Sequence, residues 1–152
     1  MQKREYKDGE VCGVLEKERA KMTEIKELFQ SADWKSEKHV PVIEAQEKIK
    51  KGVPVNISVT VGKEIPHPNT TEHFIAWIAV FFLPKAEKFP YQIAKIDFSA
   101  HGASMQGPNT STIFTDPKVN CVFKTEKSGT ILASSYCNIH GLWQSAKDIT
   151  VE

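Results

Sequence analysis

The residues best equipped for chemistry are one cysteine and one histidine near the C-terminus and three histidines far upstream. Cys137 and His140 lie three positions apart, after a largely apolar run, and His39, His67 and His73 lie beside prolines or acidic residues. One thiolate with several imidazoles suits iron, copper or zinc better than calcium or magnesium. The sequence therefore predicts a transition-metal site if these five side chains meet.

The local sequence around each residue supports a shared site. The Cys137-x-x-His140 step is short enough to place both donors on one metal, although a cysteine alone is commonly just a small buried residue. Prolines on both sides of His67 stiffen its loop, which suits a ligand. His73 opens the most apolar run, where a structural histidine would need a polar partner. We expect His101 to be structural or to lie behind the ligands.

The number of donors separates three kinds of metal site. A blue-copper electron carrier usually has an axial methionine shortly after its cysteine, and all three methionines precede Cys137. A structural zinc site closes with four ligands and leaves no role for a fifth. Four imidazoles and one thiolate leave one octahedral position open, which favours a reactive site over a purely structural one.

The elements that must position these residues are short strands. Valine and isoleucine alternate with other residues over residues 53–61, as in a strand with one buried face. Similar runs follow, separated by Gly, Pro and Asn turn signals, at residues 74–83, 91–98, 112–115, 119–125, 130–136 and 149–151. About seven such strands predict an all-β fold, an immunoglobulin-like antiparallel β-sandwich. Cys121 falls inside one predicted strand, and we expect its side chain to lie in the hydrophobic core.

The N-terminal part has a different pattern. Over residues 14–30, apolar side chains recur at helical intervals among Glu and Lys, which predicts an amphipathic helix. We therefore divide the chain into an N-terminal extension with a helix, residues 1–30, and one domain, residues 31–152, that carries the candidate ligands. Cys12 lies in the polar start of the extension and receives no role.

Composition excludes several classes of function. The 20 basic and 19 acidic residues give a net charge of +1, which provides no electrostatic argument for binding nucleic acid. The longest apolar run, residues 74–83, is half the length of a membrane helix, so no membrane association is predicted. A charged N-terminus and an odd number of cysteines, three, argue against secretion and predict a cytoplasmic location.

Three stretches resemble one known family, the superoxide reductases in their one-iron, neelaredoxin-like form. They are EKHVP at 37–41, GKEIPHPNTTEH at 62–73 and SYCNIHGLW at 135–143, with shorter matches at 100–102 and 107–110. The resemblance runs from about Asp33 to the C-terminus. Members with two irons carry four cysteines in an N-terminal domain, whereas this N-terminus has only Cys12. The extension is therefore not expected to be that electron-relay domain.

The resemblance implies the roles of the site residues. It implies one mononuclear iron per chain, with His39, His67, His73 and His140 in a plane around it and Cys137 on the axis. It further implies that Glu37 caps the sixth position when iron is ferric and that Lys38 lies beside the open position. The predicted reaction is one-electron reduction of superoxide to hydrogen peroxide without release of dioxygen.

The resemblance also suggests partners. Rubredoxin or a similar small redox protein is the expected electron donor, and a homo-oligomer, a dimer or tetramer, is common in the family. The alternative function is a mononuclear copper or iron electron-transfer protein without substrate turnover, and a zinc-stabilised binding module comes third.

Overall fold

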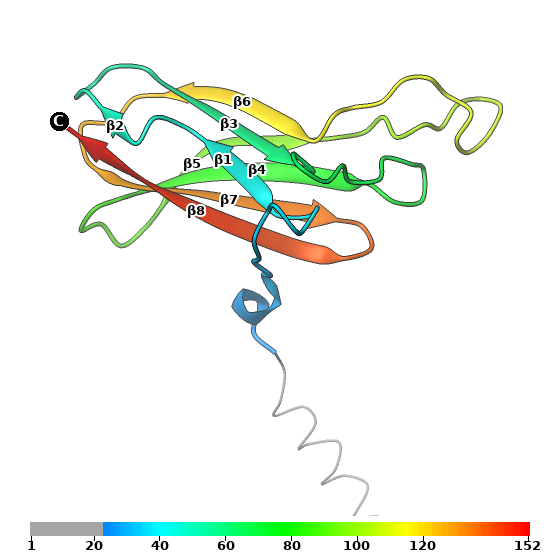
Figure 1. Cartoon of the computed structure of the whole chain (residues 1–152), viewed down its shortest axis with the longest axis horizontal. Helices are drawn as coiled ribbons and strands as arrows, with labels where there is room; N and C mark the ends of the chain where they lie inside the picture. Colours follow the sequence, from blue (N-terminus) through cyan, green and yellow to red (C-terminus); the bar gives the residue numbers. More distant parts are fainter. Residues whose placement is uncertain (1–22) are drawn as a thin grey trace, which may run out of the picture.

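The computed structural model describes residues 23–152, and these form two β-sheets that face each other (Figure 1). One sheet has three strands in the order β1-β3-β6, and the other has five in the order β2-β8-β7-β4-β5. The fold is thus an immunoglobulin-like β-sandwich, which confirms the predicted class. Its eight strands within the described residues are β1 (Pro41–Glu44), β2 (Lys48–Ile49), β3 (Val55–Val61), β4 (Ile75–Pro84), β5 (Tyr91–Asp97), β6 (Lys118–Phe123), β7 (Gly129–Cys137) and β8 (Gly141–Val151).

The core lies between the sheets and follows from alternation along the strands. In β3, the side chains of Val55, Ile57, Val59 and Val61 are buried while those between them are less so. In the facing sheet, Ile78 in β4 and the other inward side chains complete the core. Because burial of apolar surface is the main favourable term in folding, this alternation fixes which face of each strand points inward.

The register of the strands gathers five chain segments at one end of the sandwich. Pro41, at the start of β1, pairs with Val61, at the end of β3. In the other sheet, Cys137 at the end of β7 pairs with Ile75 at the start of β4 and with Gly141 at the start of β8. The loops that enter or leave these strands therefore meet at this end.

Three details of the predicted strands were wrong. Residues 112–115 form no strand and make only an isolated bridge, between Phe114 and His101. The structure adds β1, β2 and residues 141–148 of β8, which were not predicted because β1 and β2 are very short and several side chains of β8 are exposed and polar. The sheets are also not wholly antiparallel, since β2 pairs with β8 in parallel.

The predicted N-terminal helix falls partly outside the described residues, namely over residues 14–22. Over residues 23–30 the prediction of an amphipathic helix was wrong, because only one short 3-10 turn forms, η1 (Ile25–Leu28). The chain is already extended at Phe29, and Gln30 then pairs with Trp143 of β8, so sheet pairing takes the place of further helix. The division of the chain at residue 30 stays a prediction. Residues 23–152 contain no helix with the length and hydropathy of a membrane span.

Candidate metal centre

The five predicted metal ligands come from three separate segments and lie at the same end of the sandwich. His39 precedes β1, His67 lies in the loop between β3 and β4, and His73 lies just before β4. Cys137 is the last residue of β7, and His140 lies in the tight turn that leads to β8. The positive φ of Gly141, 81°, ends that turn in a conformation that favours glycine.

Their donor atoms converge. One ligand atom from each of His39, His67, His73 and Cys137 lies within 4.8 Å of all the others in this group. Nδ1 of His140 lies 3.1 Å from Nε2 of His39, 3.2 Å from Nε2 of His73 and 3.7 Å from Sγ of Cys137. The structure therefore brings together all five residues that the sequence singled out.

Hydrogen bonds at the far side of two rings select the nitrogen that faces the cluster. Nδ1 of His39 lies 2.5 Å from Oε1 of Glu37, and Nδ1 of His67 lies 2.6 Å from the carbonyl oxygen of Pro68. Nε2 of His67 is buried and has no hydrogen-bond partner. A buried polar atom without a partner is costly, so the site fits a metal ion that would accept this lone pair.

Burial favours the neutral form of three of the imidazoles, which is the form that binds a metal. Desolvation lowers the pKa of His67 from 6.5 to about 4. Desolvation is also the main cause that lowers the pKa values of His39 and His73 below the ordinary histidine value. These three rings can therefore offer their lone pairs at neutral pH without first losing a proton.

Cys137 is completely buried, with 0% of its surface exposed. Its Sγ accepts a hydrogen bond from the backbone N–H of His140 at 3.3 Å. Hydrogen bonds to a metal-bound sulfur tune how strongly it donates electron density. The same residue thus supplies an imidazole donor to the cluster and an N–H donor to the thiolate.

Asn138, between the two ligands of the turn, holds the segment that carries His73. Its side-chain Oδ1 accepts from the N–H of Phe74 at 2.9 Å, and its Nδ2 donates to the carbonyl of Glu72 at 2.8 Å. Asn109 binds the same segment from the other side, through the carboxylate of Glu72 and the N–H of Thr71. These amides hold the segment that carries His73 in place beside the cluster.

The loop that carries His67 depends on one glycine. Gly62 has a φ of 79°, and a Cβ atom there would lie 2.5 Å from the backbone nitrogen of His67. Only glycine allows this close return of the chain without strain. The loop geometry therefore comes from Gly62 together with the two prolines around His67.

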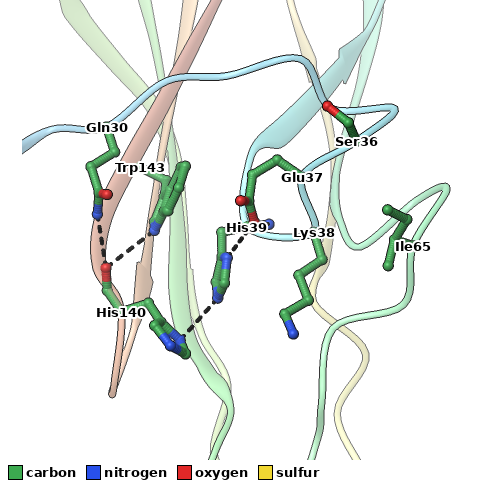
Figure 2. Close-up of a pocket in the computed structure, with 8 residues that line it drawn as sticks. All are labelled: Gln30, Ser36, Glu37, Lys38, His39, Ile65, His140 and Trp143. Atoms are coloured by element: carbon green, nitrogen blue, oxygen red, sulfur yellow. Dashed lines mark hydrogen bonds and ion pairs between the residues drawn. The ribbon is translucent and has the colours of Figure 1, made fainter.

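An open pocket of about 590 Å³ lies beside the cluster (Figure 2). Lys38 extends along this pocket opposite Ile65, and His39 and His140 form another part of its wall. Glu37 also lines it, with its carboxylate turned toward the ring of His39 (Figure 2). The pocket thus gives a small molecule access to the cluster past one cationic and one anionic side chain.

The ionisation of Glu37 follows from these contacts. Desolvation is the largest single effect and raises its pKa, but hydrogen bonds from the ring and backbone of His39 and from the backbone of Lys38 act together in the opposite direction. The net result is a pKa below the ordinary value for glutamate. Glu37 is therefore an anion at neutral pH.

His101 and Cys121 lie outside the cluster found among the described residues. The ring of His101 stacks on Phe74 at 3.9 Å, and its nitrogens contact Asn69 and the carbonyl of Phe98. Cys121 is half-buried in β6 and packs against the core. Three side chains that support the site, those of Asn138, Gln30 and Trp143, were not predicted from the sequence, although two of them fall within the stretch at 135–143 that resembles the family.

Comparisons with known proteins agree with this site. The family model for desulfoferrodoxin matches residues 31–146 of this chain. The chain is 53% identical over 128 residues to a superoxide reductase from Pyrococcus furiosus, a match covering 84% of this chain and 99% of the relative. It is 44% identical over 126 residues to a neelaredoxin from Megalodesulfovibrio gigas, covering 83% and 97% of the two chains.

A solved structure shows the same likeness. The superoxide reductase (neelaredoxin) from Archaeoglobus fulgidus in its reduced form superposes with a TM-score of 0.76 at 58% identity, covering 81% of this chain and 98% of that one. The family match and the cluster of three histidines and one cysteine together indicate a mononuclear iron site. This chain belongs to the desulfoferrodoxin family, in its one-iron, neelaredoxin-like superoxide reductase form.

Proposed function

We propose that this protein is a superoxide reductase, which converts superoxide, one electron and two protons into hydrogen peroxide and releases no dioxygen. The observation that carries the proposal is the convergence of four imidazoles and one thiolate beside an open pocket. Relatives that the chain matches over almost their whole length are named superoxide reductases.

The proposed ligands are His39, His67, His73, His140 and Cys137, which would hold one iron per chain. When bound, iron supplies the electron by cycling between its ferrous and ferric forms. The orphaned Nε2 of His67 and the hydrogen bonds that aim the rings support this assignment. The thiolate of Cys137, restrained by the N–H of His140, would donate electron density to the metal.

Lys38 would attract the substrate. Superoxide is a small anion, and a lysine in a pocket raises the local concentration of anions by electrostatic attraction. The position of Lys38 along the pocket supports this role. A water molecule held by its ammonium group would deliver a proton to the reduced product.

Glu37 would cap the open position of the ferric form. Its anionic carboxylate lines the pocket, and in this structure it is bound to His39. Capping would require the side chain to turn away from that ring. Binding of the carboxylate would stabilise the ferric form with an anion. Its return to His39 after reduction would leave the open position of the metal free.

The physiological partners are proposed from the family resemblance. Rubredoxin or a similar small redox protein would return the electron, and copies of the chain would assemble as a dimer or tetramer in the cytoplasm. Reduction of the iron-loaded protein by purified rubredoxin and light scattering of the full chain test the first two of these proposals.

The decisive experiment for the reaction is its stoichiometry. Iron-loaded protein with an electron donor should yield one hydrogen peroxide for each superoxide consumed, without dioxygen. Dioxygen and peroxide in equal amounts would identify a dismutase instead. A protein that exchanges electrons with its donor but leaves superoxide unconsumed would be an electron carrier.

A further inference from the structure

Two side chains outside the ligand set converge on one carbonyl group of the site. Nε2 of Gln30 donates to the carbonyl oxygen of His140 at 2.9 Å, and Nε1 of Trp143 donates to the same oxygen at 3.3 Å (Figure 2). Gln30 precedes the stretch that the family model matches, residues 31–146. The segment before the matched domain therefore contacts the backbone of a proposed ligand.

Gln30 is fixed by its own backbone as well. Its N–H donates to the carbonyl of Leu142 at 2.9 Å, and its carbonyl accepts from the N–H of Gln144 at 2.9 Å. It therefore pairs with the edge of β8 on both sides of Trp143, as a one-residue parallel strand. A side chain on such an anchored backbone can hold its acceptor in a defined place, although Gln30 itself is exposed.

Trp143 has a second contact with the site. It is only 8% exposed, and its ring stacks on that of His39 with centroids 5.0 Å apart and planes inclined by 13°. One tryptophan thus packs against one proposed ligand and donates to the backbone of another. The two ring nitrogens of His39 contact Glu37, through Nδ1, and His140, through Nε2.

We propose that Gln30 and Trp143 are positioning residues that fix His140 and thereby set how strongly the Cys137 thiolate donates to the metal. The link is His140 itself, because its N–H binds Sγ of Cys137 while its carbonyl is held by the two side chains. This inference rests on the proposed iron site. Releasing the carbonyl frees the turn, lengthens the N–H···S hydrogen bond and raises the energy of the sulfur lone pairs.

The test compares near-isosteric variants of the full-length protein. Gln30→Met removes the donor and keeps the length of the side chain, and Trp143→Phe removes the indole N–H and keeps a ring beside His39. The control is Gln144→Met, the same change at an exposed glutamine of β8. The readouts are the sulfur-to-iron charge-transfer band of the ferric protein, the midpoint potential and the affinity for iron.

We expect both site variants to shift the band to longer wavelength, lower the potential and weaken iron binding by about 10-fold. The control should behave as the wild type. A second readout uses protein without metal, in which Gln30→Met should speed hydrogen exchange of the amides at residues 138–142. Unchanged bands, potentials and exchange rates in both site variants would overturn the inference. A wild type without a charge-transfer band would instead refute the proposed iron site.

Discussion

Nε2 of His39 lies 3.1 Å from Nδ1 of His140, although 101 positions separate the two residues in the chain. This contact joins a loop of the three-stranded sheet to a turn of the five-stranded sheet. Because the two nitrogens are the ring atoms that a shared metal ion would use, the contact marks the centre of the proposed site.

Removing the cation of the pocket should slow the encounter with substrate. Lys38→Ala should reduce the rate of reaction with superoxide and flatten its dependence on ionic strength, while iron stays bound, because salt screens attraction between exposed charges. Pulse radiolysis at several salt concentrations measures both effects. Lys88→Ala removes the same charge in the loop between β4 and β5 and should retain the wild-type salt profile. An equally steep profile in Lys38→Ala would exclude the steering role.

Removing the carboxylate of Glu37, the proposed cap, should change the ferric form of the protein and not the ferrous form. Glu37→Ala should alter the absorption spectrum of the ferric resting protein and leave the reaction of the ferrous protein with superoxide close to wild type. Glu64→Ala, in the loop that carries His67, serves as the control of equal charge. A ferric spectrum identical to that of the wild type would show that Glu37 does not reach the iron and serves only to orient His39.

Replacing the sulfur should remove the colour of the ferric protein. Cys137→Ser keeps a small polar side chain at this buried position but abolishes the sulfur-to-iron charge-transfer band, because no thiolate remains. The control is Cys121→Ser, which replaces the half-buried cysteine of β6 and should retain the band. Visible absorption after loading with iron checks both variants, and a persistent band in Cys137→Ser would place the thiolate ligand elsewhere.

Loosening the segment of His73 should weaken iron binding. Asn138→Ala loses the hydrogen bonds to Phe74 and Glu72, at a cost of about 1 kcal/mol of stability for each. Asn138→Asp keeps the acceptor for the N–H of Phe74 and should lose less. Urea unfolding and iron titration test this order, and equal stability and affinity of all three proteins would show that the side chain of Asn138 is dispensable.

The protein without metal should lose stability as pH falls from about 7.5 to about 5.5. The pKa values of His39, His67 and His73 lie below the ordinary 6.5, so in this range the unfolded chain takes up protons that the folded chain does not. The free energy of unfolding therefore decreases toward acid, and the contribution of His67 ends near its folded pKa of about 4. Urea unfolding at each pH measures the slope.

The matched variant for this prediction is His67→Leu. It removes the histidine whose pKa is lowered to about 4, and the unfolding free energy of this variant should depend less on pH in the same range. A slope as steep as that of the wild-type protein would mean that His67 does not carry the effect.

Much of the fold was predictable from local patterns. The alternation of valine and isoleucine in β3 and the apolar run of β4 identify buried strands, because burial on one or both faces leaves a periodic signature. The strand predicted at residues 112–115 was wrong because its apolar side chains, Ile113 and Phe114, stay exposed in a loop. The helix over residues 23–30 was wrong because backbone pairing of Gln30 with β8 is a long-range contact.

The donors themselves could be identified from the sequence: four imidazoles with one thiolate, in stretches shared with a known family. Their meeting, the ring nitrogen that each histidine turns inward, and the support from Gln30, Trp143 and Asn138 became visible only in the folded chain. Ligand identity is a local chemical property of each residue. Convergence depends on strand register and on hydrogen bonds between residues as far as 110 positions apart, which no local pattern encodes.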